Sequence, residues 1–127
     1  MTILTSVALA ILAQGPVAAV PGPQAEYDVG YEELVAHRDA EARKAIEACD
    51  ELAQDDPARL INHAIALART GDYDAARAAF TVVAEARASV ELETATGDWV
   101  DSRRLARKGL AMLDRGEFSR YYALSLR

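Results

Sequence analysis

Residues 57–85, PARLINHAIALARTGDYDAARAAFTVVAE, decide the fold of this chain, because they predict two helices that fold back on each other. The first helix carries apolar and small residues at helical spacing: Leu60, Ala64, Leu67 and Ala68. Gly71 suits the left-handed position that ends a helix, and Asp72 or Asp74 can cap the helix that follows. The second helix has its apolar face at i, i+4 and i+7: Ala76, Phe80 and Val83. Such a hairpin leaves apolar surface uncovered, so we expect neighbouring elements to cover it.

This hairpin resembles a tetratricopeptide repeat, a helix–turn–helix unit of roughly 34 residues that stacks into arrays. In that family a Gly-Asp-Tyr-like turn is followed by a small residue and, four positions later, an aromatic residue. Here the turn is Gly71-Asp72-Tyr73, and the two positions are Ala76 and Phe80. His63 stands where the family usually has an apolar residue. The resemblance covers about one repeat, extends to short exported repeat proteins of Gram-negative bacteria, and implies an all-α fold of about five helices in TPR-like hairpins.

Composition predicts one globular helical domain. The chain has 127 residues, of which 51% are hydrophobic and 27% charged, a balance typical of folded domains. Alanine is abundant and aromatic residues make up only 6%, which suits closely packed helices. The net charge of −6 argues against general nucleic-acid binding.

Charge is distributed unevenly along the chain. Residues 26–101 carry 18 acidic and 7 basic residues, whereas residues 102–127 carry 2 acidic and 7 basic ones. We expect the basic segment to fold back onto the acidic body. The alternative is an anion-binding face on one side of the last helix, because arginine binds carboxylates well. That face would consist of Arg103, Arg104, Arg107 and Lys108.

The N-terminal segment predicts export. Residues 1–25 have no charged side chain, and the apolar run Ile3–Ala13 has the length of a signal-peptide core. A membrane span would need about 20 apolar residues. Small residues at 17–19 favour cleavage after Ala19, although the absence of Lys and Arg before the run leaves two alternatives: a misassigned start or an apolar helix that stays attached. We therefore expect a signal peptide at 1–19, a linker at 20–26, a helical domain at 27–127, a periplasmic location and no membrane anchor after cleavage.

The segment before the hairpin predicts a first, degenerate repeat. In a helix from Tyr27 onward, five residues would lie on one side: Tyr27, Tyr31, Leu34, Val35 and Arg38. Asp39 would cap a second helix with a long apolar stripe: Ala42, Ala45, Ile46, Cys49, Leu52 and Ala53. Because the turn motif is missing at 37–39, either a tight turn or one long bent helix would join the two.

After Glu85 the spacing of apolar residues changes from the helical period to alternation. Residues 90–94 alternate apolar and acidic side chains, which predicts a half-buried strand, and a turn at 96–98 leads to a returning strand at Trp99. A third degenerate repeat is the alternative, because Gly97-Asp98-Trp99 is similar to Gly71-Asp72-Tyr73. We prefer a short extended or β-hairpin element near residues 89–100 that tucks Trp99 into the helical body. Asp101 or Ser102 would then cap a last helix that Gly116 closes. Its predicted buried face is Leu105, Leu110 and Leu113, with Ala106 and Gly109 allowing close approach.

The sequence offers no catalytic constellation. His37 and His63 lie on different predicted helices without an acidic partner at ligand spacing, so no metal site is expected. Cys49 falls on an apolar stripe, which predicts an inert buried thiol. No glycine-rich phosphate loop follows a strand. We therefore expect a protein that is not an enzyme and needs no cofactor.

The resemblance also implies where a partner would bind. In tetratricopeptide repeats the first helix of each hairpin lines a concave groove, and an Asn at the position of Asn62 bonds the backbone of a bound peptide. The corresponding face here carries Asn62, Ile65 and Arg69. The expected function is protein or peptide interaction, with a self-associating structural protein, for example a homodimer, as the alternative.

Overall fold

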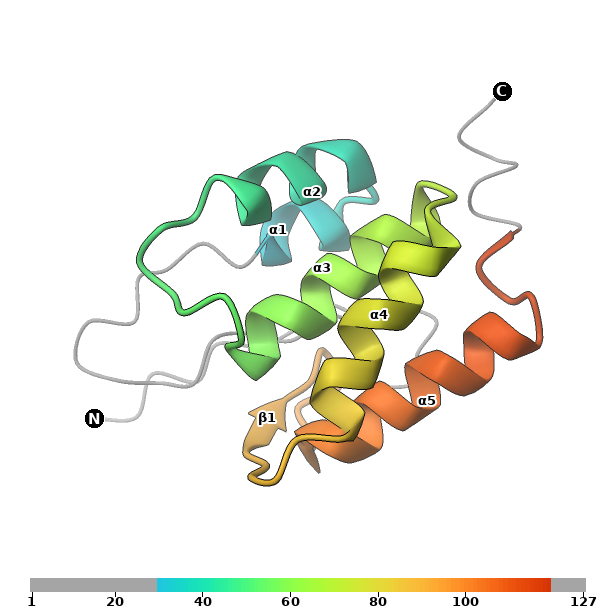
Figure 1. Ribbon diagram of the computed structural model, residues 1–127. Coiled ribbons are helices and arrows are strands. Elements are labelled where there is room, and N and C mark those ends of the chain that lie inside the picture. Colours follow the sequence, from blue (N-terminus) through green and yellow to red (C-terminus); the bar gives the residue numbers. More distant parts are fainter. Residues whose placement is uncertain (1–29, 120–127) are drawn as a thin grey trace.

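The computed structural model describes residues 30–119, which form five α-helices and a two-stranded antiparallel sheet (Figure 1). In chain order these are α1 (Tyr31–Val35), α2 (Asp39–Glu47), α3 (Pro57–Arg69), α4 (Tyr73–Ala84), β1 (Glu91–Glu93), β2 (Trp99–Asp101) and α5 (Ser102–Asp114). A mostly helical fold with one short extended element is therefore confirmed. The predicted signal peptide, the linker and the last eight residues, 120–127, lie outside the described residues.

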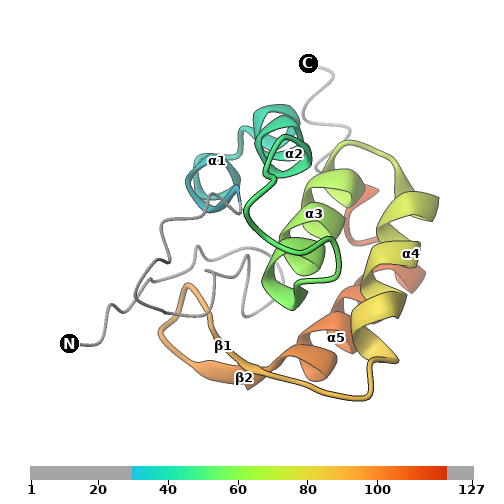
Figure 2. The same ribbon diagram turned by 60° about the vertical axis from the view of Figure 1, so that its left-hand side comes forward.

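α3 is the central element of this arrangement. It packs against α2, α4 and α5, and Figures 1 and 2 show it between the α1–α2 pair and the α4–α5 pair. Ten of its thirteen residues are buried, which is far more than the single face expected of a surface helix. The other helices are arranged around it.

The predicted hairpin of α3 and α4 is confirmed. Asp56 accepts a hydrogen bond from the Arg59 amide at 3.0 Å, and Pro57 occupies the first turn, where a missing N–H costs nothing. Gly71 has a φ of 88° and ends α3, while the Asp72 amide donates back to the Leu67 carbonyl at 2.8 Å. Asp72 stands at the N-cap position of α4, but the predicted side-chain cap is absent; its carboxylate lies 3.6 Å from Arg43 instead.

A tight turn joins α1 and α2, which confirms the first of the two predicted alternatives, a tight turn or one long bent helix. His37 adopts a φ of 56° there, so the two helices are separate. The prediction that α2 continues to Ala53 is wrong, because the helix ends at Glu47. The acids at 50 and 51 would sit at the negative end of a longer helix, and the carbonyls of Cys49 and Leu52 accept hydrogen bonds from Arg59 instead.

A β-hairpin, and not a third repeat, follows α4 (Figure 2). Leu92 pairs with Val100, and both are buried, which places their face toward the core. Trp99 pairs with Glu93 on the opposite face and is 45% exposed. The prediction that Trp99 tucks into the helical body is therefore wrong, because strand alternation directs it away from Leu92 and Val100.

α5 begins and ends at the predicted residues. The Asp101 carboxylate accepts from the amides of Arg103 and Arg104 at 2.8 and 3.2 Å, and Gly116 follows the last turn with a φ of 67°. The buried face contains Leu105, Ala106, Gly109 and Met112, whereas the predicted Leu110 and Leu113 are only half-buried. Gly109 faces the ring of the fully buried Phe80, so a side chain there would collide with it.

Replacing Gly109 by Ala should lower the free energy of unfolding by about 1–3 kcal/mol, the usual cost of overpacking a core. The clash with Phe80 would outweigh the roughly 1 kcal/mol that Ala normally contributes over Gly in a helix. Urea unfolding measures the change. Combining Gly109→Ala with Phe80→Leu should cost less than the sum of the two single changes. Additive losses would contradict the contact.

The cap at Asp101 makes the stability of the fold depend on pH in a direction that can be predicted. A hydrogen bond from Ser89, followed by those from the Arg104 and Arg103 amides, holds the pKa of Asp101 below its usual value. The stabilisation that ionised Asp101 provides is therefore complete above its pKa in the unfolded chain, about 4. It is lost as the pH falls through the lower pKa of the folded protein. Asp101→Ala should cost about 0.5–2 kcal/mol at neutral pH in urea melts, and Asp101→Asn much less, because Asn also caps helices. A cost of Asp101→Ala that persists at strongly acid pH would contradict this.

Candidate functional site

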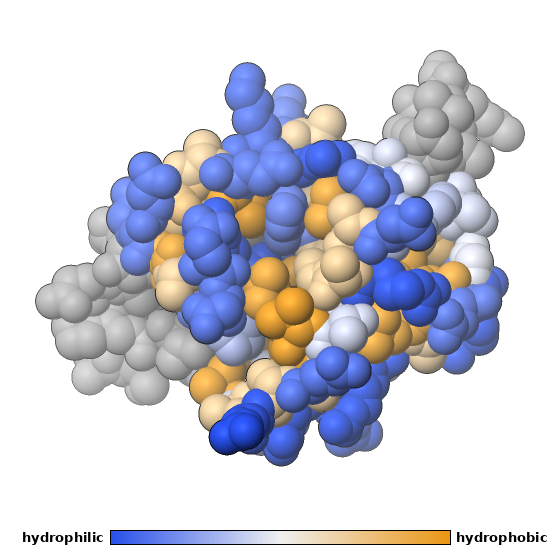
Figure 3. Space-filling view, in the orientation of Figure 1, coloured by the Kyte–Doolittle hydropathy of each residue, from blue (hydrophilic) through white to orange (hydrophobic). Residues whose placement is uncertain are grey.

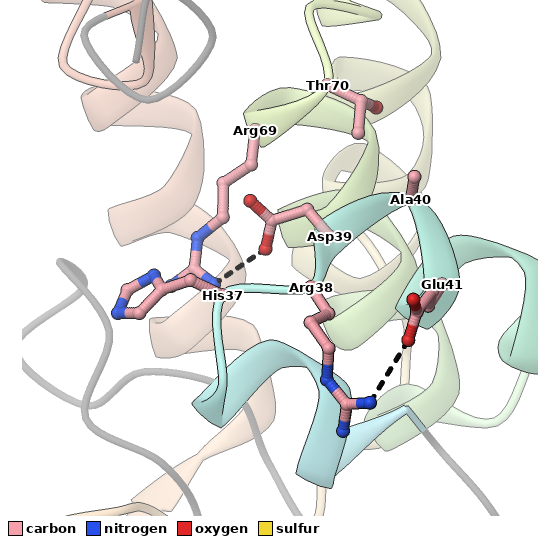
Figure 4. Close-up of a pocket in the computed structure, with 7 residues that line it drawn as sticks. All are labelled: His37, Arg38, Asp39, Ala40, Glu41, Arg69 and Thr70. Atoms are coloured by element: carbon pink, nitrogen blue, oxygen red, sulfur yellow. Dashed lines mark hydrogen bonds and ion pairs between the residues drawn. The ribbon is translucent and has the colours of Figure 1, made fainter. Parts of the chain in front are cut away.

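A surface cavity of about 410 Å³ lies where the α1–α2 turn meets the end of α3 (Figure 4). The left-handed turn at His37 brings the start of α2 to one side of it, and the last turn of α3 supplies the other. Its lining residues are mostly polar or charged: His37, Arg38, Asp39, Ala40, Glu41, Arg69 and Thr70.

The most buried interaction in this cavity is an ion pair. Figure 4 shows Arg69 reaching from the end of α3 to Asp39, and the Nη1–Oδ1 distance is 3.1 Å. The Arg69 side chain has no exposed surface, and that of Asp39 is 14% exposed. The same Nη1 atom donates to the Leu34 carbonyl at 3.1 Å. Arg69 thus fastens the α1–α2 turn to α3.

The remaining polar groups of the cavity are engaged or solvated. Thr70 donates its hydroxyl to the carbonyls of Ala66 and Leu67, so it is part of the end of α3. Arg38 and Glu41 form an ion pair of 3.1 Å, but both side chains are more than half exposed, and such pairs contribute little. The contacts of Thr70, Arg38 and Glu41 are therefore contacts within helices or between exposed side chains.

Among the described residues, His37 and His63 are not part of a group of potential metal ligands. Within residues 30–119 no three His, Cys, Asp or Glu side chains are grouped as a metal site requires. His63 does have an acidic neighbour, Glu47, at 3.4 Å. Burial opposes ionisation of Glu47, but hydrogen bonds from Arg43 and His63 outweigh it and hold the pKa of Glu47 below its usual value. This cluster joins α2 to α3.

The three residues predicted to line a partner groove are buried. Asn62 and Ile65 have no exposed surface, and Arg69 is 1% exposed. In this arrangement they do not form an open groove, which corrects the prediction from sequence. The physical reason at Arg69 is its ion pair with Asp39, since a buried guanidinium needs acceptors within the protein.

The basic face of α5 remains on the surface. Arg104 and Arg107 are exposed, and Arg103 and Lys108 are half-buried. Arg103 lies 3.8 Å from Asp101 at the start of its own helix. The ion pair that joins α5 to α4 has the opposite polarity to the one predicted, with Asp114 on α5 and Arg77 on α4 at 2.8 Å. Among the described residues, α5 therefore docks through the apolar contact at Gly109 and not through its arginines.

Exposed apolar residues are distributed over several elements. Figure 3 shows apolar residues reaching the surface in separate places on one face of the molecule. The large exposed ones belong to α1, α4 and the β-hairpin region: Val35, Tyr73, Val82, Val90 and Trp99. A smaller cavity of about 180 Å³ lies between the start of α4 and the end of α5, lined by Tyr73, Arg77, Leu113, Gly116, Phe118 and Ser119.

Sequence reasoning missed Glu93. Alternation along 90–94 predicts that Glu91 and Glu93 share a solvent-facing side, yet Glu91 is exposed and Glu93 is only 8% exposed. The Oε2 atom of Glu93 is buried and has no hydrogen-bond partner. Strand periodicity contains no signal that separates the two residues, because both belong to the same alternating face.

Comparison with known protein families, with curated proteins and with solved structures finds no match to this chain. Within residues 30–119 no helix combines the length and apolarity needed to cross a bilayer.

The buried ion pair predicts a large difference between two arginines of the same cavity. Arg69→Met should lower the free energy of unfolding by about 3–5 kcal/mol, because it leaves the Asp39 carboxylate without its partner. Arg38→Met removes an exposed pair and should cost less than about 1 kcal/mol. Urea melts of both variants check this, and equal losses would show that Arg69 does not hold the turn.

Proposed function

We propose that this chain is an exported, TPR-like protein- or peptide-interaction module without catalytic activity. The observation that carries the proposal is the α3–α4 hairpin with its Gly71-Asp72-Tyr73 turn, packed against a second helix pair, α1–α2. Stacked helical hairpins form surfaces that bind other chains. The cavity beside α2 supports recognition, because polar and charged side chains line it and can form hydrogen bonds with a partner.

The surface offered to a partner differs from the predicted groove. Since Asn62, Ile65 and Arg69 are buried, we place recognition on exposed parts of the acidic body, which has 18 acidic and 7 basic residues between 26 and 101. Such a surface favours partners with positive charge. Export to the periplasm is part of the proposal and rests on the apolar run Ile3–Ala13.

Self-association is the second candidate. Arg104 and Arg107 are exposed on α5, and their guanidinium groups make no ion pair within residues 30–119. Two copies could place these arginines against the acidic body of one another. Added salt would weaken such contacts between exposed charges.

The two candidates differ in solution mass and in partner capture. Expressed with its leader in a Gram-negative host, the protein should appear in the periplasmic fraction with Val20 as its first residue. Light scattering should give a monomer, and affinity capture from periplasmic extract should retain one partner at constant stoichiometry. A salt-sensitive dimer that Arg104→Glu with Arg107→Glu dissociates, and that retains no partner, would favour self-association. Intact Met1 in the cytosol would contradict export.

A further inference from the structure

Glu93 is a buried residue of β1, and among the described residues one of its carboxylate oxygens has no partner. It is 8% exposed, its Oε2 atom is buried, and that atom makes no hydrogen bond. No Lys, Arg or His among residues 30–119 forms an ion pair with it. Buried carboxylates in proteins are normally paired, because an isolated charge is strongly disfavoured away from water.

Other acidic residues of the described part are better compensated. The Oε2 atom of Glu33 is also buried without a hydrogen-bond partner, but Glu33 as a whole is only half-buried. Asp39, which is also largely shielded from solvent, has Arg69 at 3.1 Å. Glu91 lies two residues before Glu93 on the same face of β1 and is exposed, so water solvates its charge. Glu93 has neither kind of compensation. A residue whose burial is unfavourable and is not offset by its neighbours is a candidate for function.

One aromatic side chain, Trp99, lies beside this carboxylate, and a second, Tyr31, is near enough to be influenced by its charge. Trp99 is the cross-strand partner of Glu93, so the two side chains project from the same face of the hairpin. Tyr31 approaches from the start of α1: burial raises the pKa of its hydroxyl, and the charge of Glu93 raises it further. Trp99 remains 45% exposed and is therefore accessible to a ligand.

We propose that Glu93, Trp99 and Tyr31 form a recognition site for a cationic group, an ammonium or guanidinium, carried by a basic side chain of a bound peptide. The carboxylate would accept charge-assisted hydrogen bonds from the cation, and the aromatic rings would attract it through their faces. The acidic body around the site raises the local concentration of cations. This inference rests on the proposed function, since it names the partner chemistry of the same interaction module.

The single tryptophan of the chain makes the site directly observable. Trp99 is the only Trp in the sequence, so its fluorescence reports binding at the hairpin. Acetyl-Gly-Lys-Gly-amide and acetyl-Gly-Arg-Gly-amide should change this fluorescence saturably. The norleucine analogue, which has an apolar side chain of similar length without the charge, should not. Tighter binding of the lysine peptide than of methylammonium supports a peptide side chain as the ligand, and equal binding would overturn that assignment.

Two matched variants separate a specific site from a generally acidic surface. Glu93→Gln should weaken peptide binding about tenfold or more, the effect expected for losing a charge-assisted hydrogen bond. Glu91→Gln, on the same strand and face, should change it less than about twofold. Equal losses in the two variants, or no saturable response to either cation, would overturn the proposal.

Thermal unfolding provides a readout that does not involve a ligand. Because Glu93→Gln removes an uncompensated buried charge, its melting temperature should equal or exceed that of the wild type. A lower melting temperature would show that the carboxylate holds the fold together and would overturn the site.

The outcome is also distinguishable from failure of the proposed function. If the wild type and Glu93→Gln capture the same partner equally well, the interaction module stands and the cation site is overturned. If lysine peptides bind at Trp99 in a Glu93-dependent way but no partner chain is captured, the site stands and the proposed function fails.

Discussion

α3 can be buried on nearly all sides only because its two buried arginines find acceptors in the segment that precedes it. Arg59, in the first turn, donates to the carbonyls of Cys49 and Leu52. Arg69, in the last turn, donates to the Leu34 carbonyl and pairs with Asp39. The three carbonyl acceptors belong to the last turn of α1 and the segment after α2, and the carboxylate belongs to the first residue of α2. The two arginines therefore fix the α1–α2 pair against both ends of the central helix.

Local signals explain why the sequence predicted the α3–α4 hairpin and the cap of α5 correctly. Gly71 and Asp101 act on backbone groups within a few residues of themselves, so their roles can be inferred without knowing the tertiary structure. The end of α2 was predicted too late for the opposite reason. The apolar residues Cys49 and Leu52 continue the helical spacing, but their carbonyls accept hydrogen bonds from the side chain of Arg59 on the next helix.

Burial of polar residues was the part of the candidate site that periodicity could not predict. Asn62 and Arg69 occupy positions that a repeat pattern assigns to an open groove, and only the tertiary structure shows them covered. Glu93 and Trp99 illustrate the same limit on a strand, where alternation separates two faces but does not specify what covers each one. Propensity and spacing describe one element at a time, whereas burial depends on its neighbours.

α1 is attached to the rest of the molecule in a way that favours its local unfolding. α1 has five residues and a single buried one, Leu34, so it is too short to persist as a helix by itself. Its link to α3 runs through Arg69, 35 residues further along the chain. Amides in this N-terminal layer should therefore exchange with deuterium through local unfolding, while those of α3 and α4 exchange only when the whole domain unfolds. Each such opening would bring the guanidinium of Arg69 to the surface, so that a face covered in the closed molecule becomes transiently available.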